Sequence, residues 1–176
     1  MELPKQYMLD TNVFGNLVDG SFHLEDLPSD GQFWATPVQW AEIIKAPDKV
    51  QTKFKELIAD QKMILAGFAF DIPGAGWGES EWRQDGKLWH ALKKELDDAL
   101  EIRWASNHVK EEKRKREKEK NSKDASIAEA AMFNCFTFIT SDKALIAAAM
   151  KHGIDVLVPK GQSNQSTVKR PSSGAD

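Results

Sequence analysis

The chain has 176 residues, 41% of them apolar and 29% charged, a composition typical of a globular domain and unlike that of a collagen or a disordered chain. It carries 24 Lys and Arg against 27 Asp and Glu, a formal net charge of −3, which on its own argues against a nucleic-acid partner. The one cysteine, Cys135, excludes an internal disulfide and a multi-cysteine zinc site.

The first elements are a short strand and three helices. Residues 6–9 are an apolar run that predicts a buried strand ending at Asp10, with a helix starting beside Thr11. Thr36 followed by Pro37 is typical of a helix N-terminus, and this helix carries Glu42. A further amphipathic helix is predicted after Pro47, at roughly 49–61.

The middle of the chain is less regular. A strand is predicted over 63–72, followed by a Gly-rich loop over 73–86 that contains Trp77 and Trp82. A long helical tract over about 87–120 is indicated by an apolar residue at every fourth position: Leu88, Leu92, Leu96, Leu100 and Trp104. The whole region 71–123 is expected to be an enlargement of the domain.

The last part of the chain alternates helices and strands. A helix is predicted to begin at Asp124, then a buried strand over 135–140 that includes Cys135, a helix over 143–152 and a strand over 154–158. The polar segment 160–176 is expected to be a disordered tail. Strands alternating with helices predict one α/β domain over 1–159, a three-layer α/β/α sandwich around a parallel sheet.

Four acidic residues occupy positions where such a sheet would gather them. Asp10 and Asp142 follow predicted strands, and ligands of parallel sheets bind beyond the carboxyl ends of the strands. Asp124 and Glu42 lie on helices beside these strands. Any one of the aspartates is adequately explained as a helix cap, and Glu42 as part of a solvated face. If all four meet, their mutual repulsion calls for a cation, and hard oxygen ligands select Mg²⁺ or Mn²⁺.

Four segments, in this order, resemble the acidic motifs of the PIN-domain nucleases, which include the toxin ribonucleases of bacterial toxin–antitoxin pairs. The segments are MLDTNVF, TPVQWAEI, KDASIAEAAMFN and FTFITSDKAL. The resemblance covers the first fifty residues and roughly the last sixty of the globular part. It does not cover the middle, which is longer than in the compact toxins, and Ala144 stands where many members have a further acid.

The resemblance implies a Mg²⁺- or Mn²⁺-dependent endoribonuclease. Its metal ligands would be Asp10, Glu42, Asp124 and Asp142, and the polar residues supporting the ligands or the scissile phosphate would be Thr11, Asn12, Thr140 and Ser141. The partners it implies are an RNA substrate and an antitoxin protein, and a homodimer is also considered. With no signal peptide and no membrane-spanning run in the sequence, a cytoplasmic location without a membrane partner is expected.

The charge-dense segment 110–123 has a local charge of +4, so the rest of the chain sums to −7. Its basic side chains, Lys113, Arg114, Lys115 and Arg116 above all, would follow an RNA backbone. The more economical interpretation is a solvated helix whose charges pair at i,i+4 spacing. Trp77 and Trp82 also have two interpretations, stacking on unpaired bases or packing within the protein.

Two other functions compete with the nuclease. The aspartyl-phosphate hydrolases need a second Asp where this chain has Asn12, which disfavours them. A non-catalytic PIN-like module that binds RNA or protein stays open, because acidic residues alone do not demonstrate turnover.

Overall fold

The computed structural model describes residues 4–59, 63–65, 87–105, 107 and 109–159. The elements in chain order are β1 (Lys5–Leu9), α1 (Thr11–Asp19), a 3-10 turn η1 (Leu24–Asp26), β2 (Gly31–Ala35), α2 (Pro37–Ile43), α3 (Asp48–Ala59), β3 (Met63–Leu65), α4 (Lys87–Trp104), α5 (Glu111–Phe133), β4 (Thr137–Ile139), α6 (Lys143–Lys151) and β5 (Val156–Leu157).

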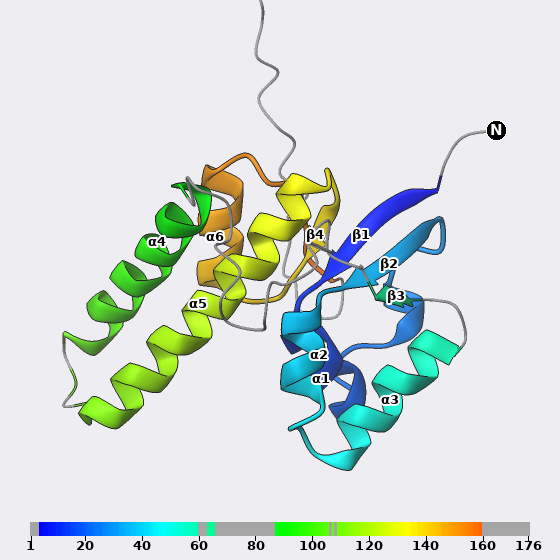
Figure 1. Ribbon diagram of the computed structural model, residues 1–176, viewed down its shortest axis with the longest axis horizontal. Helices are drawn as coiled ribbons and strands as arrows, with labels where there is room; N and C mark the ends of the chain where they lie inside the picture. The colour runs from blue at the N-terminus through cyan, green and yellow to red at the C-terminus, as the bar shows by residue number, and fades with distance from the viewer. Residues whose placement is uncertain (1–3, 60–62, 66–86, 106, 108, 160–176) are drawn as a thin grey trace, which may run out of the picture.

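The strands form one sheet in the order β3-β2-β1-β4-β5, and every pair is parallel. Helices α1 and α3 lie on one side of the sheet and α4, α5 and α6 on the other, as Figure 1 shows. The predicted fold class, a three-layer sandwich with a central parallel sheet, is confirmed.

Two hydrophobic clusters hold the layers together, one on each face of the sheet. Successive side chains of a strand point to opposite faces, so Tyr7 and Leu9 of β1 belong to one cluster and Met8 to the other. All three are buried, which is why the second half of the strand, residues 7–9, is continuously apolar.

The long helical tract predicted over 87–120 is wrong as a single element. The chain turns back after Trp104, and α4 and α5 lie side by side as an antiparallel pair (Figure 1). The predicted apolar stripe does face inward, with Leu92, Leu96, Leu100 and Trp104 buried.

Helix α5 runs without a break through Asp124, so the prediction that a helix begins at Asp124 is wrong. No Gly or Pro interrupts 111–133, and the residues there are mostly Lys, Glu, Arg and Ala, all good helix formers. The four residues Lys120, Asn121, Lys123 and Asp124 therefore belong to consecutive turns of one helix.

Two smaller points also differ from the sequence-based predictions. Cys135 is exposed, with a positive φ of 56°, in the turn that follows α5, and β4 begins only at Thr137. Strand β2 was not predicted. Only Phe33 and Ala35 of its five residues are buried, so its sequence contains no long apolar run. The loop over 73–86, most of the strand predicted over 63–72 and the tail over 160–176 lie outside the described residues.

Within the described residues, no helix combines the length and the apolar character needed to cross a lipid bilayer.

Gln39 links α2 to the end of β1. Its side-chain amide donates to the carbonyl oxygen of Leu9, and its Oε1 accepts from the backbone N–H of Thr36 at 2.7 Å. Thr36 in turn accepts from the Gln39 backbone, which completes a capping box. Because Gln39 is fully buried, both polar ends of the side chain are satisfied inside the core.

The substitution Gln39→Ala should lower the free energy of unfolding by about 1–3 kcal/mol, because it leaves a buried carbonyl and a buried N–H without partners. Urea denaturation would measure it. The control is Gln32→Ala on β2, where the side chain is half-exposed and little change is expected. Equal urea midpoints for the two variants would contradict the assigned role.

Candidate active site

The strand order reverses between β1 and β4, which is where ligands bind in open parallel sheets. Asp10 follows β1, and Thr140, Ser141 and Asp142 follow β4. The N–H of Asp10 donates to the carbonyl oxygen of Ile139 at 2.9 Å, so the two strand ends are in direct contact.

Asp10 is fully buried, and only one of its carboxylate oxygens is satisfied. Oδ2 accepts from the Thr140 hydroxyl at 2.8 Å and from the Asn12 amide at 3.1 Å. Oδ1 is buried and has no hydrogen-bond partner among the described residues. Asp10 occupies the N-cap position of α1, but its side chain does not cap the helix. The cap interpretation therefore fails for this residue.

Asp142, by contrast, does cap a helix. Its Oδ1 accepts from the backbone N–H groups of Ala144 at 2.8 Å and Leu145 at 3.1 Å, at the N-terminus of α6. The backbone N–H of Asp142 donates to the Thr140 hydroxyl at 3.2 Å. Thr140 thus fixes both Asp10 and Asp142, which fits the supporting position predicted for it.

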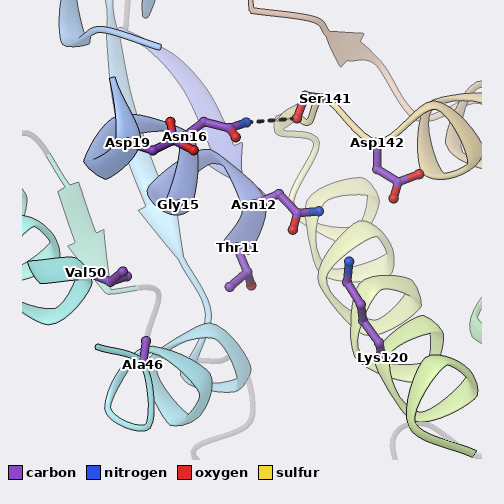
Figure 2. A pocket seen from close by; sticks show the side chains of 10 residues that line it. All are labelled: Thr11, Asn12, Gly15, Asn16, Asp19, Ala46, Val50, Lys120, Ser141 and Asp142. Carbon is purple, nitrogen blue, oxygen red and sulfur yellow. Dashed lines mark hydrogen bonds between the residues drawn. The ribbon is translucent and has the colours of Figure 1, made fainter. Parts of the chain in front are cut away.

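Glu42 is half-buried on α2 and is held from two sides. The Thr11 hydroxyl donates to its Oε2 at 2.9 Å, and the Lys123 ammonium lies 3.2 Å from its Oε1. Ser141, the last of the predicted supporting residues, accepts from the Asn16 amide at 3.1 Å (Figure 2).

Asp124 joins these residues from α5. It is buried, and its pKa is raised to about 8, first by burial and next by the negative charge of Asp10; the charges of Asp142 and Glu42 add to this rise. All four predicted carboxylates are therefore close enough to act on one another. Burial also raises the pKa of Asp10, although the Thr140 hydrogen bond opposes the rise.

The carboxylates are gathered but do not close around one point. Among the described residues, no three His, Cys, Asp or Glu side chains lie close enough together to hold a metal ion. The carboxylates are held apart by the contacts just described: Glu42 pairs with Lys123, and Asp142 caps the N-terminus of α6.

A pocket of about 520 Å³ opens next to the acidic residues (Figure 2). Its lining comes from α1, the segment between α2 and α3, α3 itself, α5 and the turn before α6: Thr11, Asn12, Gly15, Asn16, Asp19, Ala46, Val50, Lys120, Ser141 and Asp142.

The sequence does not single out Asn16, and it offers Lys120 and Lys123 only as members of the basic segment 110–123. Lys120 precedes Asp124 by four residues and Lys123 by one, so a helix predicted to continue through Asp124 would have put Lys120 on its face. Asn16 follows Asn12 by four residues on α1 in the same way.

The four basic residues singled out in the sequence lie elsewhere. Residues 113–116 precede Asp124 by eight to eleven positions, roughly 12 Å or more along the helix axis. Arg114 pairs with Glu101 of α4 at 3.7 Å and lies over the Trp104 ring. These contacts support the interpretation of 110–118 as a charged helix face. Trp77 and Trp82 lie outside the described residues.

No protein-family model and no curated protein sequence matches the chain. Among solved structures, it is similar to one described as VapBC2 from Rickettsia felis bound to a DNA fragment from their promoter. The identity is 16% and the TM-score 0.44, over 88% of this chain and 99% of the other. A TM-score of this size is too low to carry a functional inference.

The raised pKa of Asp124 predicts that the metal-free protein loses stability as the pH rises. The folded state binds the Asp124 proton up to about pH 8, whereas an unfolded chain releases it near pH 4, so the free energy of unfolding falls between these values. From pH 5 to pH 8 we expect a fall of about 2–4 kcal/mol.

Urea denaturation in EDTA at several pH values would measure this fall. Asp124→Asn should make the dependence shallower and should be more stable than the parent at pH 8. A variant with the same pH slope as the parent would contradict the assignment.

Proposed function

We propose that the protein is a divalent-metal-dependent endoribonuclease that hydrolyses RNA phosphodiester bonds. The observation that carries the proposal is the buried Oδ1 of Asp10, which has no partner among the described residues and belongs to a cluster of four carboxylates. A buried anionic oxygen without a partner is costly, and a cation is the ligand that would offset this cost.

The donor set suits Mg²⁺ or Mn²⁺, which favour carboxylate oxygens. Asp10, Glu42, Asp124 and Asp142 would hold the ion; when bound, it would supply Lewis acidity toward a phosphate and lower the pKa of a water molecule. Thr140 and Asn12 keep one oxygen of Asp10 occupied, and Thr11 orients Glu42. This leaves Oδ1 of Asp10 for the ion, whereas Oε1 of Glu42 is paired with Lys123.

RNA as the substrate rests on the resemblance of the four acidic motifs to those of the PIN-domain nucleases. The same resemblance implies that the chain is the toxin of a toxin–antitoxin pair and that a small antitoxin covers the site. A homodimer also stays a prediction, and all of these partners await a direct test.

One observation favours the alternative, a non-catalytic module that binds RNA or protein. The Lys123 ammonium occupies Oε1 of Glu42, so that one of the four carboxylates already has a cation partner. A protein that binds RNA but does not cleave it with any divalent metal would be such a module.

The test is cleavage of labelled RNA by the parent, Asp10→Asn and Asp124→Asn with Mg²⁺, Mn²⁺ or EDTA. We expect cleavage by the parent with either metal and none in EDTA. Each substitution should reduce the rate by more than the roughly 10–100-fold that follows loss of an outer partner of a metal ligand. The matched control is Asp98→Asn, an exposed acid of α4 that pairs with Lys94.

A second measurement separates metal binding from catalysis. Mn²⁺ should raise the unfolding temperature of the parent and of Asp98→Asn, and raise that of Asp10→Asn much less, because a ligand that binds only the folded state stabilises it. Cleavage at the parental rate by Asp10→Asn, or an equal Mn²⁺ response in all variants, would refute the proposed site.

A further inference from the structure

We infer that Lys120 is a substrate-binding residue whose ammonium binds a backbone phosphate of the RNA at the edge of the acidic cluster. That the ligand is RNA rests on the proposed function, whereas the position of the Lys120 ammonium comes from the fold. In the sequence, Lys120 is one of the basic residues of the segment 110–123, and the structure separates it from the four at 113–116 by placing it at the pocket.

Lys120 lies one helical turn before Asp124, so the two residues share a face of α5. It lines the pocket together with Asn12, Ser141 and Asp142. Figure 2 shows its side chain extending from α5 toward Asn12 and Asp142. Its positive charge lowers the pKa of both Asp10 and Asp124 and partly offsets the effect of burial on each.

The lysines around it differ in what they contact. Lys118 pairs with Glu101 of α4 at 2.7 Å, and Lys123 pairs with Glu42 at 3.2 Å. Lys120 is exposed and forms no ion pair within 4.0 Å in the part of the chain that the structure describes. The Lys120 ammonium is close enough to Asp10 and Asp124 to lower the pKa of both, but it forms no ion pair with a carboxylate of the described residues.

An acidic cluster needs such a group if its ligand is a polyanion. Phosphates that approach Asp10, Asp124 and Asp142 are repelled by each of these acids that is ionised, and the repulsion is stronger where water is excluded. A lysine at the edge offsets part of this repulsion. A compact ammonium on a flexible stem is a common partner of phosphate.

The rest of the pocket lining is consistent with this assignment. Asn12, Asn16 and Ser141 are neutral and polar, and they add no repulsion of their own. The remaining acid besides Asp142 is Asp19, which Figure 2 shows well away from Lys120, at the far end of α1. The phosphate is therefore expected at the Lys120 end of the pocket.

The experiment measures binding separately from cleavage. Fluorescence anisotropy of a labelled single-stranded RNA, with Ca²⁺ in place of Mg²⁺ and the RNA checked for integrity, would be recorded at several salt concentrations. The variants are Lys120→Gln and Lys120→Arg, with Lys118→Gln as the matched control that removes the same charge from the same helix. Circular dichroism would check folding, and Mn²⁺ binding would be measured with the metal alone.

We expect Lys120→Gln to weaken RNA binding by about tenfold and to reduce the slope of log K against log salt by about 0.7, the value for one phosphate contact on a single strand. Lys120→Arg should restore most of the affinity, Lys118→Gln should bind as the parent does, and Mn²⁺ affinity should not fall in any of them. An unchanged Lys120→Gln, an equal loss in Lys118→Gln, or a parallel loss of Mn²⁺ binding would overturn the inference.

The outcomes also separate this inference from the proposed activity. A parent that binds RNA through Lys120 but does not cleave it with Mg²⁺ or Mn²⁺ would refute the nuclease and leave the phosphate site standing. A parent that cleaves RNA with no loss of RNA binding in Lys120→Gln would do the reverse.

Discussion

The hydrogen bond from Thr140 to Asp10 is the contact on which the site depends. It joins the end of β1 to the end of β4, the two strands between which the order of the sheet reverses. The same hydroxyl accepts from the backbone of Asp142, so one threonine sets the relative positions of two acidic residues 132 positions apart in the sequence. Because this bond satisfies only one oxygen of Asp10, it leaves the other buried without a partner among the described residues. That oxygen is the geometric basis of the cation that we propose for this site.

Helix α5 supplies the other half of the site, and its packing determines what reaches the cluster. Ala125, Ala128 and Ala131 are buried against the sheet and α6, and such small side chains allow the helix to approach closely. Asp124 is carried inward with them. Residues on the adjoining turns, Lys120 and Lys123, come to lie beside the acids that Asp124 faces. One helix therefore brings both an anion and two cations to the same edge of the sheet.

The fold class and the strand-end positions of Asp10 and Asp142 could be predicted from local patterns, whereas Glu42 and Asp124 were assigned to the site by the resemblance of their motifs. Apolar runs that end in Asp mark strands feeding a crevice, and the structure brings Asp10 and Asp142 together as that pattern implies. What could not be predicted depends on continuity and pairing. The charged segment 110–123 and the alanine-rich segment after it differ in composition and were predicted as separate elements. No residue between them breaks a helix, however, so α5 continues and places Lys120 one turn before Asp124. Strand β2 has only two buried side chains, and its place is fixed by pairing with β1 and β3, which local sequence does not encode.

The charge of the whole chain also turns out to be the wrong quantity for deciding what the protein binds. The net value of −3 averages over groups that lie far apart, and salt screens charges beyond about 8–10 Å. Much of the basic segment lies along the α4–α5 pair, where Arg114 and Lys118 are matched by Glu101.

At the cluster, four carboxylates face two lysines, one of them already paired with Glu42. Once all four acids are ionised, the local excess is negative and confined to one edge of the sheet. Such an excess attracts a small divalent cation first, and a phosphate only where a positive group stands at its border. The nucleic-acid binding that we propose would therefore depend on the order of charges across a few side chains and not on their sum.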